Sequence, residues 1–424
     1  MHKIIILTSA LFAAVSSVAQ SDIKSYVKEN SIAVNSIQPG STGFSDLEAV
    51  GAAIGNARIV MLGEQDHGDA PAFLAKTRLI QYLHEKKGFN VVAFEADFFG
   101  LTNGWDHLNK TEDEMYPFLK KNITGVWSYC DACQELFKKV IPQSFSSGNP
   151  IQVSGIDNQL ALHYSKNNLT RQLDSVLQNL QLPVTKTNNY RTEVVPIIDS
   201  LTKFLFYPKK FTFYERAAAK LSAVRSEMSV VMSSNNFWGM VVDNLIELAT
   251  EFKYIPDDEV KYRNIRDVQM ANNLKWLCTV KYPGEKIIVW AQNFHISKNN
   301  GHYQSRLLDK YVSMGNEFTN DTAFNNNTYI IGFTSYQGQA GRVGSIPYNV
   351  EKPSGNSFEN WIDERYNYAF VDFKKFNASN SGRAPRFNMN GSVVYIHKKQ
   401  ALQWTKIFDG VFYIKNMYPC KMIP

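Results

Sequence analysis

The sequence has little of what characterises membrane, nucleic-acid-binding or disulfide-built proteins. Four cysteines in 424 residues are too few to build the fold from disulfides. The formal charge of +6 is scattered in short runs, so we expect no nucleic-acid partner. Beyond the N-terminus, no apolar run is long enough to be a membrane span. With 44% hydrophobic residues, the chain can instead bury a substantial core.

The N-terminus has the pattern of a secretory signal peptide. Lys3 precedes an apolar run over residues 4–15, and small residues follow at 17–19. The run is too short to cross a bilayer as a stable helix. We therefore expect residues 1–19 to be removed and residues 20–424 to be exported, to the periplasm or outside the cell. A cytoplasmic protein with an apolar start is the alternative.

The cysteines predict no metal site and no redox centre. Cys130 and Cys133 form a Cys-x-x-Cys pair, but no strand runs directly into it as a thioredoxin-type site requires. We expect either a local disulfide between these two residues or two free thiols. Zinc would need further ligands, and Cys278 and Cys420 have none near them in sequence.

Apolar runs and helical patterns alternate along the chain, which is typical of an α/β fold. Strand-like runs occur at residues 58–62, 90–95, 151–156, 286–291, 328–333, 368–373, 392–397 and 411–415, with helical patterns between several of them at 72–87, 132–140 and 263–280. This alternation predicts a mainly parallel central sheet flanked by helices. Residues from about 160 to 260 carry almost no strand signal, so we expect an inserted all-helical lobe there.

Three of the expected strands end in residues capable of acid–base chemistry. In open α/β sheets, ligands bind at the carboxyl ends of the strands. We expect Gly63 to let the backbone turn sharply after the first strand. The residues at these ends are Glu64 and His67, then Glu95, and finally Gln292, Asn293 and His295.

These residue types favour hydrolysis by an activated water molecule. The chain lacks Gly-x-Ser-x-Gly, so no nucleophile elbow presents a serine. An imidazole, with an unperturbed pKa of about 6.5, can take a proton from water, and we assign this role to His67. Glu64 or Glu95 would orient the ring and offset its charge. His295 and Lys76 are candidates to hold the carbonyl oxygen as it becomes negative.

The same residues allow other interpretations. Glu64, His67, Glu95 and His295 are chemically able to hold a divalent ion, which would make the hydrolysis metal-dependent. The carboxylate of Glu95 needs a buried partner such as Lys76, so a purely structural ion pair is the alternative to its catalytic role. A non-catalytic envelope protein that binds a ligand in the same pocket is a third possibility.

Short motifs spread over nearly all of the mature chain resemble those of the erythromycin esterase family and occur in the same order. They include Leu62-Gly-Glu-Gln-Asp-His-Gly68, Gly88-Phe89, Ala93-Phe-Glu95, Gly155-Ile-Asp-Asn-Gln159, Arg266-Asp267, Val289-Trp-Ala-Gln-Asn-Phe-His295 and Phe408-Asp-Gly410. The resemblance implies an α/β core with a helical lobe. It also implies hydrolysis of macrolide lactones, an antibiotic-resistance activity, without a required metal or other cofactor.

The resemblance also implies roles for individual residues. His67 matches the family's general base, and Glu64 and Glu95 match its two site carboxylates. Lys76 lies where family members carry a cationic side chain, often arginine. We expect Arg266-Asp267 to brace a helix rather than perform chemistry.

One position departs from the family pattern. His295 matches the second histidine of a His-Asn-x-His motif, but the first histidine is Gln292 here. Glutamine can hydrogen-bond but cannot move protons at neutral pH. We therefore expect Gln292 to contact the substrate, together with Asn293, Lys76 and Trp127.

The sequence thus predicts an exported hydrolase of erythromycin esterase type. We expect it to bind a small-molecule ester or lactone, with macrolides among the candidates, and to need no cofactor.

Overall fold

The computed structural model describes residues 22–203, 210–255, 257–298, 308–380, 384–393 and 396–423. The expected signal peptide, residues 1–19, lies outside the described residues. The described chain begins with a helix at residues 22–30. Within the described ranges, no helix combines the length and the apolar character needed to cross a membrane.

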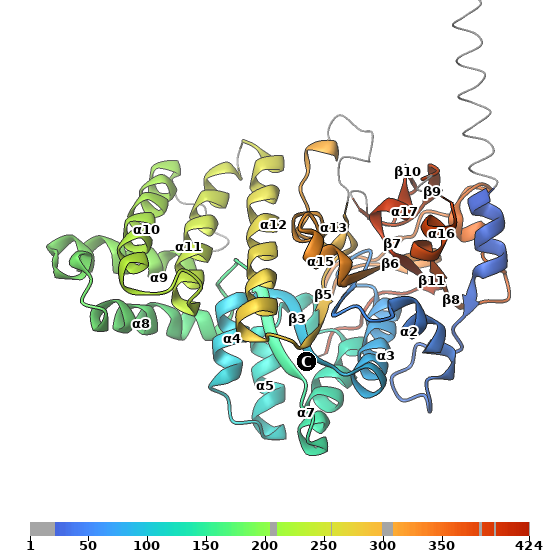
Figure 1. The fold of residues 1–424 in the computed structure, drawn as a ribbon, viewed down its shortest axis with the longest axis horizontal. Helices are drawn as coiled ribbons and strands as arrows, with labels where there is room; N and C mark the ends of the chain where they lie inside the picture. Colours follow the sequence, from blue (N-terminus) through green and yellow to red (C-terminus); the bar gives the residue numbers. More distant parts are fainter. Residues whose placement is uncertain are drawn as a thin grey trace, which may run out of the picture.

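A nine-stranded sheet forms the centre of the molecule (Figure 1). Its order is β1-β8-β11-β6-β2-β5-β3-β4, and β7 pairs with β6. The bounds are β1 Ile32–Ala33, β2 Ile59–Leu62, β3 Phe89–Asp97, β4 Gln152–Asp157, β5 Lys286–Trp290, β6 Thr328–Ala340, β7 Tyr348–Asn349, β8 Tyr368–Asp372 and β11 Gly410–Met417. The neighbours from β11 to β4 all run parallel, whereas β8, β1 and β7 pair antiparallel. The predicted, mainly parallel α/β sheet is confirmed.

Helices cover both faces of this sheet because its central strands are apolar on both sides. Successive side chains of a strand point to opposite faces. On β2, Ile59 and Met61 pack into one hydrophobic cluster, which also takes in the helical lobe. Val60 and Leu62 pack into the other, which takes in the helix that follows β2. Burial on both faces explains the continuous apolar runs of the sequence.

α-Helices make up most of the remaining regular structure. Their bounds are α2 Glu48–Ile54, α3 Ala70–Lys87, α4 Phe98–Asp106, α5 Glu112–Asn122, α6 Gly125–Ser128, α7 Ile141–Ser144, α8 His163–Asn179, α9 Val195–Lys203, α10 Phe211–Val231, α11 Phe237–Tyr254, α12 Glu259–Trp276, α13 Asn293–Ile296, α14 Met314–Thr319, α15 Thr322–Asn326, α16 Phe373–Ser379 and α17 Trp404–Ile407. The long helix α3 has Pro71 in its first turn and ends at Gly88, whose φ of 71° is left-handed. Both residues are favoured at these positions by their backbone geometry.

The helical lobe lies to one side of the sheet. Helices α8 to α11 stand together at the left of Figure 1, and α12 lies between them and the strands. From the end of β4 to the start of β5, the described residues form helices and turns without a strand. The predicted inserted all-helical lobe is therefore confirmed.

One local prediction is wrong. The described residues of 392–397 are not in a strand, and Ser392 and His397 have φ values of 48° and 49°. That left-handed backbone is incompatible with an extended strand. Residues 394 and 395 lie outside the described residues. The helical pattern at 132–140 is confirmed, with a 3-10 turn at Asp131–Cys133 and a π-helix at Leu136–Val140 within it. A short two-stranded sheet, β9 Phe387–Met389 with β10 Gln400–Leu402, lies nearby.

The cysteine pairing also differs from both predicted states. Cys130 forms a disulfide with Cys420, which is 290 residues away in sequence. Cys133 and Cys278 are buried free thiols. The end of the chain returns to Cys130 and places the two Cα atoms 5.3 Å apart, within the usual range for a disulfide. Proximity in sequence was therefore the wrong guide to the partner.

This pairing predicts the result of peptide mapping without reduction. Cys130 and Cys420 should be recovered in one cross-linked peptide by mass spectrometry. Because Cys133 and Cys278 are buried, both should react with an alkylating reagent only after unfolding. A cross-link between Cys130 and Cys133 would contradict the pairing.

Candidate functional site

The carboxyl ends of four neighbouring parallel strands, β2, β5, β3 and β4, bring polar residues together. The backbone N of Asn293 donates to the Glu64 carbonyl at 2.8 Å. The backbone N of Gln292 donates to Glu95 Oε2 at 3.1 Å, and its side-chain Nε2 donates to the Gln65 carbonyl at 3.3 Å. The predicted residues from three strand ends therefore belong to one site.

The backbone of Gly63 packs closely against the side chain of Asn293, next to Glu64. Gly63 has no left-handed backbone, so the predicted sharp turn is not its role. A Cβ at this position would lie 1.9 Å from Asn293 Oδ1. The Asn293 amide donates to the carbonyls of Phe333 and Gly391, each at 2.7 Å, and accepts from the Phe333 N–H at 3.0 Å. Asn293 is thus a buried tie between loops, which corrects its prediction as a substrate contact.

A fully buried carboxylate, Glu64, organises the first half of the site. Its Oε1 accepts from His67 Nδ1 at 3.0 Å and from Trp127 Nε1 at 3.1 Å. Its Oε2 accepts from the ammonium group of Lys76, which lies 4.1 Å from the centre of the Trp290 ring. Burial lowers the pKa of Lys76, and the Glu64 charge opposes that shift. Lys76 and Trp127 hold Glu64 and are themselves buried, so neither is placed to contact a substrate as predicted.

Solvent reaches this first group at His67. Its side chain is 13% exposed, whereas that of Glu64 is 0% exposed. A carboxylate can only accept hydrogen bonds, so His67 Nδ1 carries a proton, and in the neutral ring Nε2 is then the acceptor. The ring also packs edge-on against Trp127, with ring centroids 5.1 Å apart. This is the geometry of a histidine base oriented by an acid.

Arg266 organises the second half of the site. Its Nη2 donates to Glu95 Oε1 at 3.0 Å and to Asp157 Oδ2 at 2.6 Å, and its Nε donates to Asp157 Oδ1 at 3.1 Å. The helix α12 thus directs this guanidinium into the strand ends, whereas the sequence predicts only a bracing role for it. The expected partner of Glu95 is also corrected, because Lys76 pairs with Glu64 instead.

His295 lies between two carboxylates. Its Nδ1 donates to Asp267 Oδ1 at 2.8 Å, and its Nε2 donates to Glu95 Oε1 at 3.2 Å. Burial would lower the pKa of His295, but the charges of Asp267 and Glu95 outweigh it and raise the pKa to about 10. Burial would likewise raise the pKa of Glu95, but His295, His67 and Arg266 hold it well below its ordinary value. At neutral pH, His295 is therefore an imidazolium beside a carboxylate.

One edge of the Arg266 guanidinium remains free. Its Nη1 lies 3.3 Å from His295 Nε2. Both atoms are donors when His295 is protonated, so this contact is not a hydrogen bond. Both cations are held instead by the same oxygen, Glu95 Oε1. Among the described residues, no carboxylate accepts from Nη1, and the Arg266 side chain is 16% exposed.

Glu251 is a further buried carboxyl group that the sequence pattern does not reveal. It lies on α11 and accepts from Asn158 Nδ2 at 3.0 Å and from Gln159 Nε2 at 3.4 Å. Burial raises its pKa to about 8, with the charge of Arg266 opposing the shift. Glu251 therefore attaches the helical lobe to the loop after β4 mainly as a neutral acid.

A small cavity opens beside the site at Gln292. It has a volume of about 170 Å³, and it is also lined by Glu259, Arg263, Phe294, Tyr311, Arg342, Ser392, Val393 and Ile396. The cavity is connected to the site through Gln292, whose backbone N donates to Glu95. Pockets that enclose drug-sized ligands have about 300–1,000 Å³. This cavity therefore fits a small ester or one part of a larger ligand.

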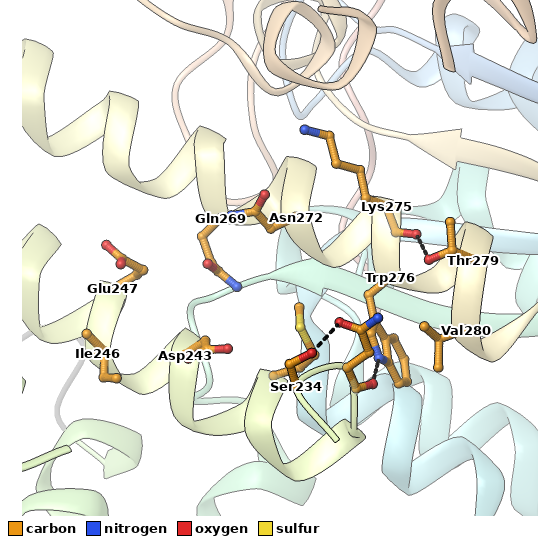
Figure 2. A pocket seen from close by; sticks show the side chains of 12 residues that line it. Ser234, Asp243, Ile246, Glu247, Gln269, Asn272, Lys275, Trp276, Thr279 and Val280 are labelled. Carbon is orange, nitrogen blue, oxygen red and sulfur yellow. Dashed lines mark hydrogen bonds between the residues drawn. The ribbon is translucent and has the colours of Figure 1, made fainter. Parts of the chain in front are cut away.

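A larger cavity lies elsewhere, between α11 and α12. It has a volume of about 450 Å³. Figure 2 shows Asp243 and Glu247 on one of these helices and Gln269 and Asn272 on the other. Its lining contains none of the residues at the carboxyl ends of the strands, whereas the smaller cavity includes Gln292. Size alone would therefore select the wrong place for acid–base chemistry.

A Ser–His–Asp set is present but closed to substrate. His397 Nε2 lies 2.9 Å from Asp69 Oδ1, and its Nδ1 lies 3.2 Å from Ser335 Oγ. All three residues are at most 1% exposed, whereas a nucleophile must contact its substrate. Asp69 also accepts from the backbone N of Asp66 at 2.8 Å, next to His67. The set therefore stabilises the loop that carries His67.

Comparisons with known proteins identify a family and relatives that match along most of the chain. Residues 84–417 match the family model described as erythromycin esterase. YbfO of Bacillus subtilis strain 168, provisionally named a hydrolase, is 24% identical over 403 residues, covering 89% of this chain and 88% of that protein. Erythromycin esterase type II of Escherichia coli is 22% identical over 422 residues, covering 88% and 93%.

Solved structures show the same fold. A Bacillus cereus protein superposes with a TM-score of 0.72 at 17% identity, over 96% of this chain and 99% of its own. A histidine-to-asparagine variant of the erythromycin esterase EreC, in its open conformation, superposes with a TM-score of 0.67 at 18% identity, over 90% and 96%.

The buried pair predicts a large stability effect for Lys76→Met. The variant leaves the Glu64 carboxylate buried without its cation, which should lower the free energy of unfolding by about 3–5 kcal/mol. Urea denaturation measures this loss. The double variant Glu64→Gln, Lys76→Met should recover much of it, because no unpaired charge remains. A single variant as stable as the wild type would show that the pair is not formed.

The raised pKa of His295 predicts a stability change at alkaline pH. Its pKa is about 10 in the folded chain against an ordinary 6.5. The protonated form therefore stabilises the fold fully below about pH 6.5, and this contribution is lost as the pH rises toward 10. The free energy of unfolding should fall less between pH 7 and pH 9.5 in His295→Gln than in the wild type. Equal slopes would mean that His295 is neutral.

Proposed function

Because the chain belongs to the erythromycin esterase family, we propose that it is an exported hydrolase that cleaves an ester or lactone. Family membership supports a hydrolase, and the site geometry supports the mechanism. The observation that carries the proposal is the bond from His67 Nδ1 to the buried Glu64. With Nδ1 bonded to Glu64, the other ring nitrogen, Nε2, can act as a base beside the cluster of carboxylates and cations.

In the proposed reaction, His67 Nε2 takes a proton from a water molecule as that water attacks the carbonyl carbon. Glu64 offsets the charge that His67 gains, and Lys76 holds the Glu64 carboxylate by direct bonding. The imidazolium of His67 then gives its proton to the leaving alkoxide. Both proton transfers use the same ring nitrogen.

The carbonyl oxygen becomes negative during this attack and needs a donor. We assign this role to Arg266 Nη1, since the other nitrogens of that guanidinium already bond to carboxylates. The His295 imidazolium beside it adds positive charge in a largely buried setting. His295 and Lys76 were the sequence-based candidates, and Lys76 is fully buried against Glu64.

We propose that the reaction needs no metal. Each site carboxylate already bonds to a cation, Glu64 to Lys76 and Glu95 to Arg266 and His295. These positive groups would repel a divalent ion. Across the described residues, the only cluster of potential ligand atoms close enough for a metal is Cys130, Asp131 and Cys420, and its two cysteines form the disulfide.

Export is supported by two observations. The N-terminal residues have the signal-peptide pattern described above. A structural disulfide is typical of proteins that work in an oxidising compartment such as the periplasm or the extracellular space.

The small cavity and Gln292 favour a substrate smaller than a macrolide. About 170 Å³ holds an acyl group or a small lactone ring, and Gln292 lines this space with a side chain that can only hydrogen-bond. A panel of short-chain esters, small lactones and macrolides therefore tests the substrate class. Turnover confined to macrolides would contradict the size argument.

The His67→Asn variant tests the proposed mechanism. It should lower kcat for the best ester of the panel by about 100- to 10,000-fold, because the general base is lost. Asparagine should leave KM and stability nearly unchanged. His163→Asn, an exposed histidine on the helical lobe, is the matched control and should keep full activity.

Two outcomes distinguish the alternatives. Activity that is lost on chelation and returns with a divalent metal would establish the metal-dependent mechanism. If the wild type and His67→Asn are equally inert on the whole panel while the wild type still binds a ligand, the chain is a binding protein.

A further inference from the structure

The last residues of the chain form a strap, residues 418–423, next to the loop that carries His67. The backbone N of Cys420 donates to the Gly68 carbonyl at 2.9 Å, and the backbone N of Ala70 donates to the Tyr418 carbonyl at 3.2 Å. Asp69 and Pro419 form an antiparallel bridge between these two contacts. The strap therefore runs along the residues that directly follow His67, at the start of α3 (Figure 1).

The other edge of the strap holds the segment that follows Trp127. The backbone N of Asp131 donates to the Lys421 carbonyl at 3.0 Å, and the Lys421 N–H returns to Asp131 Oδ1 at 2.9 Å. The Ile423 N–H donates to the Tyr129 carbonyl at 3.0 Å. The disulfide joins Cys420 of the strap to Cys130 of this same segment, so this edge is held covalently, whereas the edge at Gly68 is held by hydrogen bonds.

Both segments held by the strap deliver a donor to the same atom. Gly68 directly follows His67, and Cys130 lies three residues after Trp127. His67 Nδ1 and Trp127 Nε1 donate to Glu64 Oε1 at 3.0 and 3.1 Å. A change in the relative position of the two segments would therefore disturb the orientation of the imidazole. We propose that the strap, closed by the Cys130–Cys420 disulfide, positions His67, and that the hydrolase reaches full activity only after this disulfide forms.

The disulfide is needed because the strap is otherwise weakly held. Its side chains at Tyr418 and Met422 are 45% and 66% exposed, so they contribute little packing. Single backbone hydrogen bonds add little net stability. Without the covalent link, the strap would leave the Gly68 carbonyl and the Asp131 segment.

Disulfide closure requires an oxidant that carries a disulfide of its own. Cys130 and Cys420 lose two electrons and two protons, their S–S bond forms, and the oxidant becomes a dithiol. Cys133 does not compete for Cys130, because burial raises the pKa of its thiol well above the ordinary value and the Glu64 charge adds to that shift. Activity would therefore appear in the oxidising compartment to which we propose the chain is exported.

Reversible reduction of the full-length enzyme tests this proposal, which rests on the proposed function. A dithiol reagent should expose two thiols in the native protein and lower kcat for ester hydrolysis by about tenfold, because misplaced catalytic groups slow the chemical step. KM should change by less than about twofold, since the substrate cavity does not include the strap. Reoxidation should restore kcat.

Variants separate positioning from general stability. Cys130→Ser, Cys420→Ser should have the low kcat of the reduced enzyme, at temperatures well below its Tm, and should not respond to the dithiol. Cys278→Ser removes a buried thiol outside the strap and should behave like the wild type. Amide hydrogen exchange should accelerate at residues 66–70 and 128–132 on reduction, but not in helices α8 to α11.

The possible results decide the proposal. A reduced enzyme that exposes two thiols and keeps its full kcat would overturn it. If the oxidised wild type hydrolyses no ester, the proposed function fails, and hydrogen exchange alone then decides whether the strap orders the His67 loop. Unchanged exchange at residues 66–70 after reduction would overturn that as well.

Discussion

The buried carboxylate of Glu64 receives hydrogen bonds from three side chains that come from separate parts of the chain. His67 follows β2, Lys76 lies on α3, and Trp127 lies on α6. An ionised carboxylate in a dry interior is very costly unless it is paired and hydrogen-bonded. The folded chain must therefore bring all three donors together, and in doing so it sets the orientation of the His67 ring. The proposed chemistry depends on this arrangement.

The two histidines of the site differ because their charged neighbours differ. The His67 ring bonds to one carboxylate, Glu64, which also bonds to Lys76. His295 bonds to two carboxylates, Asp267 and Glu95, and its pKa rises to about 10. One imidazole is therefore placed to exchange protons, whereas the other remains a cation beside the Arg266 guanidinium. This division lets two residues of the same type serve as a base and as a source of positive charge.

Much of the fold and part of the site could be predicted from the sequence. Apolar runs that end in Glu64 and Glu95 identify buried parallel strands, and the edge they share places the site. The pairing of Lys76 could not be predicted, because a helical pattern does not reveal which strand end a side chain faces. The same limit concealed Arg266, since its orientation depends on how α12 packs. The partner of Cys420 is set by the path of the whole chain, which no local pattern contains.

The proton position on His67 tests the central claim most directly. Long-range ¹H–¹⁵N NMR spectra distinguish the two neutral imidazole tautomers, and the His67→Asn spectrum would assign the signal. We predict that neutral His67 carries its proton on Nδ1, toward Glu64, and leaves Nε2 free to accept a proton from water. A neutral ring with its proton on Nε2 would contradict the account, because that ring could neither donate to Glu64 nor serve as the base on its exposed side.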